Sequence, residues 1–103
     1  MDNKYELVIC IVNAGFSESV MIAARAAGAK GGTIIRARGS ANPTSEEFFN
    51  INIQPDKEMV MILVPKTIKE DVLHAIYKDA DLSGTAQGIA FSLPVDHTTT
   101  IKE

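Results

Sequence analysis

The residues of this chain that could take part in chemistry are few, and they form no catalytic pattern. His74 and His97 are far apart in the sequence, and neither has a cysteine or a second histidine at the spacing of a metal site. The paired carboxylates at 46–47 and at Asp79 and Asp81 lie in polar stretches, not in the apolar surroundings that suit a catalytic acid. No serine lies in a nucleophile elbow, and no Walker A or dinucleotide motif is present. These patterns indicate a protein that is not an enzyme and predict no metal site.

Two glycine-bearing stretches remain as candidates for a binding site. The first, at 31–39, ends in Gly39, and the second is a small polar loop at 83–88. Backbone N–H groups in such loops can surround an anion, although ordinary turns have the same composition. Arg36 and Arg38 are spaced by two and therefore share one face of a strand. That face is either solvated or turned toward a neighbouring subunit or an anionic ligand, and the residues alone leave both interpretations open.

Size and composition limit the classes of function. The 103 residues fit one domain over 1–103. With 10 basic and 13 acidic residues the net charge is −3, and no basic stripe indicates binding of nucleic acid. No apolar run is long enough for membrane insertion, and the start of the chain lacks a signal-peptide pattern. The single Cys10, which we interpret as a small buried residue, cannot form an internal disulfide. These features predict a cytoplasmic protein.

The first half of the chain predicts a strand, a helix and the start of a hairpin. Residues 5–13 are β-branched and nearly continuously apolar, as in a central strand. Ser17 is the predicted N-cap of a helix that runs to about Ala27, with Gly28 as its left-handed C-terminal residue. Residues 31–39 favour a second strand.

The second half predicts the return strand, another helix and a last strand. A polar loop at 40–47 and an alternating strand at 48–54 precede a turn at 55–57 and a buried strand at 58–64. Thr67 and Glu70 have the spacing of a capping box that opens a second helix. The last strand is predicted at 89–95, with Pro94 at a sheet edge.

This order predicts an α+β, ferredoxin-like βαββαβ fold, with a four-stranded antiparallel sheet and two helices on one face. The strands are too apolar for their other face to stay in water, and one chain offers no third layer. We therefore expect a homo-oligomer that buries sheet against sheet.

Three segments give the chain a resemblance to a known family. They are Gly28-Ala29-Lys30-Gly31-Gly32-Thr33, Val64-Pro65, and the stretch from Gly88 through Phe91 to Pro94-Val95. In these segments and in the order of its elements the chain resembles the P-II nitrogen-regulatory signalling family. The resemblance implies a homotrimer that binds ATP or ADP in clefts between subunits, often senses 2-oxoglutarate, and controls a target protein through a long loop.

The resemblance also implies which residues bind the effector. Thr33 and Gly39 match positions near the nucleotide, Gly88 matches a glycine of the phosphate-contacting loop, and Lys57 and Lys102 match basic positions around the cleft. Residues 40–54 stand where the target-binding loop lies, and the target itself (a transporter, an enzyme or a regulator) is not identified.

The chain also departs from the family pattern. The target-binding loop is shorter and has no tyrosine, so nucleotidylation of a loop tyrosine cannot occur there. Ile89 takes the place of the phosphate-site lysine, Thr100 that of the first of two tail arginines, and Ala41 that of a loop glycine. Each buried cationic contact contributes about 1.5–3 kcal/mol, so losing two would weaken ATP binding by a factor of about a hundred or more. The effector is then a weakly held adenine nucleotide, another small anion, or none.

The sequence is compatible with three functions. The first is a non-enzymatic regulator that binds an effector and controls a target through residues 40–54. The second is a constitutive trimeric interaction module with no nucleotide. The third, which depends only on Asp96 and His97 near the C-terminus, is a metal-tolerance protein of similar fold.

Overall fold

The computed structural model describes residues 4–40 and 55–99. The predicted strand at 48–54 and nearly all of the predicted loop at 40–54 lie outside these ranges, as do Ala41, Thr100 and Lys102.

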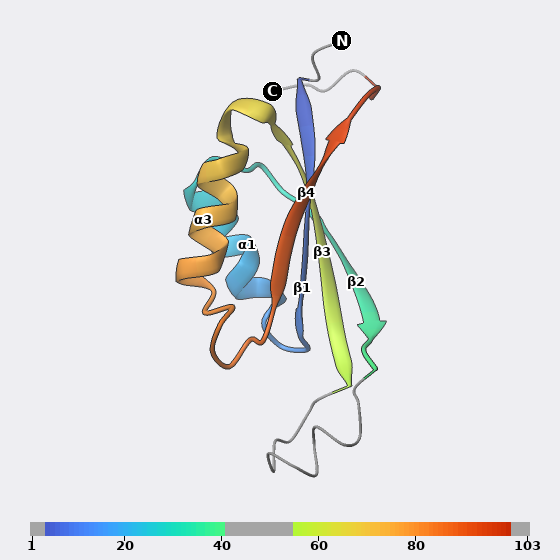
Figure 1. Ribbon diagram of the computed structural model, residues 1–103, viewed down its shortest axis with the longest axis vertical. Coiled ribbons are helices and arrows are strands. Elements are labelled where there is room, and N and C mark those ends of the chain that lie inside the picture. The colour runs from blue at the N-terminus through green and yellow to red at the C-terminus, as the bar shows by residue number, and fades with distance from the viewer. Residues whose placement is uncertain (1–3, 41–54, 100–103) are drawn as a thin grey trace.

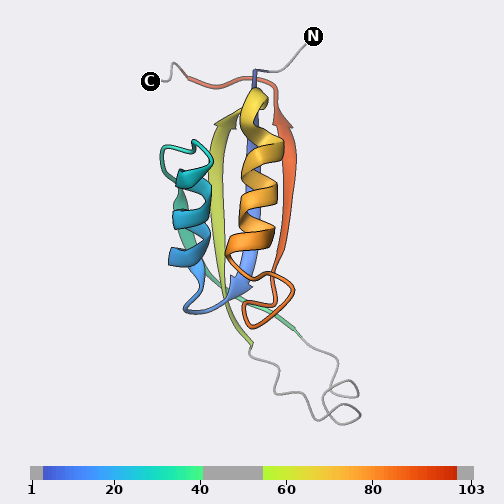
Figure 2. The ribbon, with the colours of Figure 1, turned by 90° about the vertical axis from the view of Figure 1, so that its left-hand side faces the viewer.

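Within the described ranges the chain forms one four-stranded sheet and two α-helices that lie on the same side of it (Figures 1 and 2). The elements in order are β1 (Tyr5–Asn13), α1 (Ser17–Ala26), β2 (Thr33–Arg38), β3 (Asp56–Pro65), the short 3-10 helix η1 (Lys66–Ile68), α3 (Lys69–Asp79) and β4 (Ile89–Val95). The strand order is β2-β3-β1-β4, and every neighbouring pair is antiparallel. The ferredoxin-like prediction is confirmed.

The hydrophobic core lies between the sheet and the helices. Alternate residues of β1 and β3 face the helices with no exposed surface, and they are Val8, Cys10, Val12, Val60, Ile62 and Val64. Val20 of α1 and Ile76 of α3 are equally buried and cover them. Burial raises the pKa of the Cys10 thiol to about 11. The thiol therefore stays protonated at neutral pH and packs as a small apolar group, as predicted.

Both helices begin differently from the sequence prediction. Ser17 is the first residue of α1 rather than its N-cap, which is Phe16. A carboxylate from the sheet takes the capping role, because Glu58 Oε1 accepts hydrogen bonds from the N–H of Gly15 at 2.9 Å and of Ser17 at 3.3 Å. The Thr67–Glu70 capping box is also wrong. η1 precedes α3, so hydrogen bonds of the 3-10 type satisfy N–H groups that a side-chain cap would otherwise bind.

The hairpin differs from the sequence prediction, whereas the end of α1 agrees with it. The predicted turn at 55–57 is wrong, because Asp56 and Lys57 belong to β3 and pair with Arg38 and Ala37 of β2. Gly28 has φ +112°, which confirms the left-handed end of α1. Pro94 lies in the edge strand β4, where its missing N–H is tolerated.

The other face of the sheet has no layer over it among the described residues (Figure 1). Leu7 and Ile9 of β1 pair with Leu93 and Phe91 of β4 on this side, and Leu7 also pairs with Leu63 of β3. Leu93 is 48% exposed and Phe91 is 38% exposed. We call this the open face. None of the described helices is long and apolar enough to cross a membrane.

Candidate functional site

The structure brings three of the five predicted site residues to one end of the sheet. Gly39 lies against Lys57, because a Cβ on Gly39 would be 3.0 Å from the Lys57 Cε. Lys57 pairs with Asn13 of β1, and Gly88 packs against the two residues before Asn13. Thr33 is not part of this group. It pairs with Met61, roughly 13 Å along the sheet from the Ala37–Lys57 pair. Lys102 lies outside the described residues.

Asn13 joins these segments, and the sequence analysis missed it. The Lys57 Nζ donates a hydrogen bond of 2.6 Å to the Asn13 Oδ1, and the Asn13 Nδ2 donates to the Thr85 carbonyl at 3.2 Å. The backbone N–H of Asn13 donates to the Ala86 carbonyl at 2.9 Å. The residue is only 6% exposed. A buried amide at the end of an apolar strand is the one sequence signal that could have singled it out.

The loop at 84–88 is closed by its own hydrogen bonds. The N–H of Gly84 donates to the Asp81 carbonyl and that of Thr85 to the Asp81 carboxylate, while the N–H groups of Gln87 and Gly88 donate to the carbonyls of Gly84 and Leu82. These N–H groups are not open to an anion in this conformation. A phosphate that bound them would have to break those bonds first.

The glycine at position 88 is explained by close packing. A Cβ there would be 2.7 Å from side-chain carbons of Leu82 and Val12 and 2.9 Å from the Ile11 carbonyl oxygen. Any larger residue would push the loop away from β1. Gly88 therefore fixes the distance between the loop and the strand that carries Asn13.

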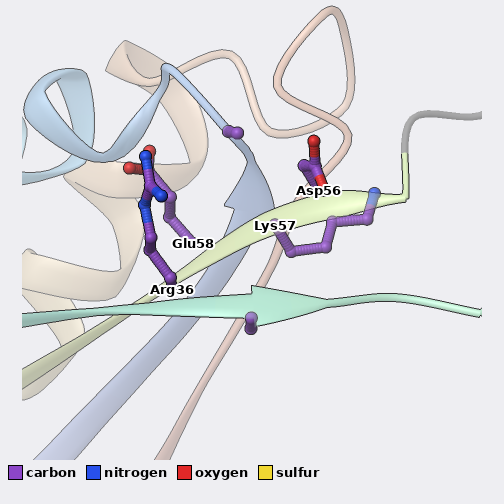
Figure 3. A pocket seen from close by; sticks show the side chains of 6 residues that line it. Arg36, Asp56, Lys57 and Glu58 are labelled. Atoms are coloured by element: carbon purple, nitrogen blue, oxygen red, sulfur yellow. The ribbon is translucent and has the colours of Figure 1, made fainter.

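A polar pocket of about 190 Å³ opens beside this end of the sheet. It is lined by Ala14, Arg36, Ala37, Asp56, Lys57 and Glu58. Figure 3 shows the side chains of Arg36 and Glu58 close together, with Lys57 extending away from them along the sheet. Ligand pockets commonly measure about 300–1,000 Å³, so this one is too small for a whole nucleotide.

The charges around the pocket are balanced. Its lining carries two cations, Arg36 and Lys57, and two carboxylates, Asp56 and Glu58. Arg36 lies opposite Glu58 across the β2–β3 pair. The N–H of Gly15 holds the pKa of Glu58 below its usual value, and Ser17 and the Arg36 charge lower it further. Glu58 is therefore an anion at neutral pH, and a ligand anion would meet a pocket without excess positive charge.

A second, more apolar hollow of about 250 Å³ lies between α3 and the start of β4. It is lined by Leu73, Tyr77, Leu82, Gly88, Ile89 and Ala90. Ile89 is 59% exposed and stands where the resemblance places a phosphate-site lysine. The surface beside the loop at 84–88 is thus apolar at the position where a bound phosphate would need a cation.

The histidines lie apart from these pockets. His97 Nδ1 is 3.0 Å from Asp96 Oδ2, and both side chains are about four-fifths exposed, at 82% and 79%. His74 is exposed on α3. In residues 4–40 and 55–99 no group of three or more histidine, cysteine or acidic residues is placed to hold a metal ion.

Comparisons with known proteins agree with this architecture. The sequence model of the family described as nitrogen regulatory protein P-II matches residues 5–103. PII of Arabidopsis thaliana, solved with citrate bound, is 28% identical with a TM-score of 0.67, and the alignment covers 91% of this chain and 77% of that one. No curated protein matches the chain.

Two bacterial structures are more distant in sequence and similar in fold. CPII of Thiomonas intermedia K12, a nitrogen regulatory PII-like protein solved with ADP, AMP and bicarbonate, is 16% identical with a TM-score of 0.69, covering 94% of this chain and 96% of that one. A putative PII-like signalling protein of Thermus thermophilus is 20% identical with a TM-score of 0.66, covering 92% and 90%. Because the family match spans almost the whole sequence, the chain belongs to the P-II family of nitrogen regulatory signalling proteins.

Proposed function

We propose that this protein is a non-enzymatic regulator. It binds a small anionic effector, an adenine nucleotide foremost, in clefts between the subunits of a homotrimer, and it controls a target protein through residues 40–54. The observation that carries the proposal is the junction at one end of the sheet. There Gly39, Lys57 and the loop at 84–88 meet Asn13, beside the two strand ends that residues 40–54 connect.

The site needs more than one subunit. The polar pocket of about 190 Å³ is too small for a nucleotide, and Thr33 lies at the far end of β2. The open face supplies a reason for subunits to associate, since its apolar side chains, Leu93 among them, remain exposed in a single chain. A neighbouring copy that covered this face would also bring its own residues to the cleft.

The ligand is expected to be a small anion with little phosphate charge. Two structural relatives were solved with anions bound, citrate in one and ADP, AMP and bicarbonate in the other. In this chain the N–H groups of Gly84, Thr85, Gln87 and Gly88 are bonded within the protein, and Ile89 stands where the resemblance places a lysine. We expect AMP to lose less than ATP from these changes, because it carries fewer phosphates that need cations.

Calorimetric titration of the assembled protein with ATP, ADP, AMP and adenosine tests the proposal, with and without Mg²⁺ and 2-oxoglutarate. Light scattering would establish the assembly first. We expect one nucleotide per subunit and a loss of about 10-fold or more in affinity for Lys57→Met, since a charged hydrogen bond contributes about 1.5–3 kcal/mol. Lys66→Met, an exposed lysine on η1, is the matched control and should bind as the wild type does. Absence of binding across the panel would contradict the nucleotide proposal.

A constitutive interaction module is the second candidate. It is favoured by the balanced charges of Arg36, Asp56, Lys57 and Glu58 and by the closed hydrogen bonding of the glycine loop. A trimer whose thermal stability did not change with any nucleotide or small carboxylate would support it, because a ligand that binds only the native state raises stability.

A further inference from the structure

We propose that Asn13 is a positioning residue that couples the loop at 84–88 to the base of the β2–β3 hairpin through Lys57. The proposal deepens the proposed function, because it says how an anion at Lys57 would act on both sides of the site. The coupling itself depends only on contacts within one chain.

The buried amide of Asn13 bridges two segments of the chain. The Asn13 Oδ1 accepts from the Lys57 Nζ at 2.6 Å, and the Asn13 Nδ2 donates to the Thr85 carbonyl at 3.2 Å. A neutral amide offers both an acceptor and a donor, and this site uses both. Aspartate would keep the acceptor for Lys57 and lose the donor to Thr85.

The two hydrogen bonds of the Asn13 amide depend on each other. Asn13 is only 6% exposed, so water cannot easily replace a partner that leaves. Losing the Lys57 ammonium would leave the buried Oδ1 unsatisfied, which favours rotation of the amide. Rotation would in turn weaken the bond to Thr85 and so loosen the loop.

Lys57 is also in contact with the base of the β2–β3 hairpin. The Lys57 stem lies against Gly39, whose N–H donates to the Pro55 carbonyl at 2.7 Å. The N–H of Ala14, next to Asn13, donates to the Asp56 carbonyl at 2.9 Å. These contacts lie where the chain leaves β2 and re-enters β3, on either side of residues 41–54.

The regulatory consequence is an exchange of partners at one ammonium group. In the structure the Lys57 ammonium binds Asn13, and an effector anion would draw it away. The two arrangements are the one in which Lys57 binds Asn13 and the one in which it binds the anion. An anion shifts their populations only if it binds the two arrangements with different affinities, and an anion that takes Lys57 from Asn13 does so. The loop at 84–88 and the hairpin base would then change together.

Amide hydrogen exchange on the ligand-free protein tests the coupling directly. The reporters are the N–H groups of Asn13, Gly84, Gln87 and Gly88, each of which donates a backbone hydrogen bond in or onto the loop. We expect Lys57→Met to speed exchange at these groups about fivefold, because residues in one hydrogen-bond network are energetically coupled. The matched control Lys66→Met should leave them unchanged.

A double-mutant cycle with Asn13→Ala distinguishes coupling from general loosening. Asn13→Ala alone should speed exchange in the loop, and adding Lys57→Met should speed it no further, because no amide remains for Lys57 to orient. Additive effects would overturn the proposal, as would Lys57→Met exchange equal to that of Lys66→Met. If Asn13→Ala fails to fold, as circular dichroism would show, the comparison of the two lysine variants decides alone.

A ligand experiment separates this proposal from the proposed function. If the wild type binds AMP, Asn13→Asp should lower the AMP affinity about tenfold and the adenosine affinity much less, because its carboxylate neutralises Lys57. Equal losses for AMP and adenosine would overturn the anion-exchange step. If the wild type binds no nucleotide, the proposed function fails, and the exchange cycle still decides whether Asn13 couples the two segments.

Discussion

The two faces of the sheet are built from alternate residues of the same strands. In a single chain one face is buried and the other is partly exposed. Val8, Cys10 and Val12 of β1 face α1 and α3 and have no exposed surface. Leu7 and Ile9, between and beside them in the sequence, face the side on which Leu93 is 48% exposed. One face is therefore completed by the chain's own helices, and the other leaves apolar side chains exposed in the single chain.

The proposed assembly would therefore use a different set of residues from those that stabilise the fold. The covered face holds short β-branched side chains that fit closely under two helices, which suits a core. The open face holds longer side chains on the edge strand β4, which suits an interface that forms after folding. Substitutions on the two faces should therefore have distinguishable effects on the free energy of unfolding and on assembly.

Ile62→Ala on the covered face should have the largest effect. Ile62 has no exposed surface, so the substitution removes buried contacts and leaves a cavity beneath the helices. We expect the free energy of unfolding to fall by about 2–5 kcal/mol. Urea denaturation followed by circular dichroism would measure the change, and a loss below about 1 kcal/mol would show that this face is not the core of the fold.

Leu93→Asp on the open face should affect assembly more than folding. The carboxylate can reach water in a single chain, so we expect a cost of about 1–2 kcal/mol in the free energy of unfolding of the subunit. In an assembled protein the same carboxylate would be buried against another subunit, which costs far more. Light scattering should find monomers with a native circular dichroism spectrum, and an unchanged assembly would show that subunits do not meet through this face.

Glu58→Gln tests the polar end of the covered face. Glutamine keeps an acceptor for the N–H groups of Gly15 and Ser17 but loses the charge that they and Arg36 stabilise. We expect a loss of about 0.5–1 kcal/mol at pH 7, the size of a helix cap.

The pH dependence of that loss has a definite sign. The pKa of Glu58 is lowered in the folded protein, so its stabilisation is present above the unfolded pKa of about 4.3 and is lost as the pH falls through the lower folded value. The melting temperatures of wild type and Glu58→Gln should therefore converge below about pH 4. A gap that stayed constant from pH 7 to pH 3 would contradict the capping role. Asp79→Asn, at the end of α3, controls for the loss of one negative charge.

Ile22→Lys should have the smallest effect. Ile22 is 62% exposed on α1, on the outer side of the helix layer. We expect the free energy of unfolding to stay within about 0.5 kcal/mol and the assembly to be unchanged. If this variant also gave monomers, the contrast between the two faces would fail, because apolar exposure on the helix side would then support assembly as well.

The fold could be predicted in detail because its signals are local. The strand at 5–13 and the last strand at 89–95 agree with β1 and β4 at both ends, since largely apolar runs bounded by glycine and polar residues mark strands. The left-handed conformation of Gly28 could also be predicted from the sequence. The helix starts were not, because local capping patterns at Ser17 and Thr67 compete with partners supplied by the tertiary structure.

The candidate site could be predicted only in part. Gly39, Lys57 and Gly88 were found through the resemblance to a family, and the structure brings these three together. Asn13 was not found, because its side-chain bonds reach residues 44 and 72 positions away in the sequence. Glu58 was missed for the same reason, since the two N–H groups that it caps are 43 and 41 positions distant.

The pattern of apolar residues is sufficient to establish the order of elements and to predict a second apolar face of the sheet, because strands that are apolar at nearly every position have to be covered on both sides. The meeting of Asn13 with Lys57 and Thr85, and of Glu58 with the start of α1, depends on the register of β1 against β3 and on the path of the loop before β4. Register is a property of paired strands, and a shift of one residue would turn every one of these side chains to the opposite face. For that reason the polar junction at the end of the sheet emerges only when the chain is folded.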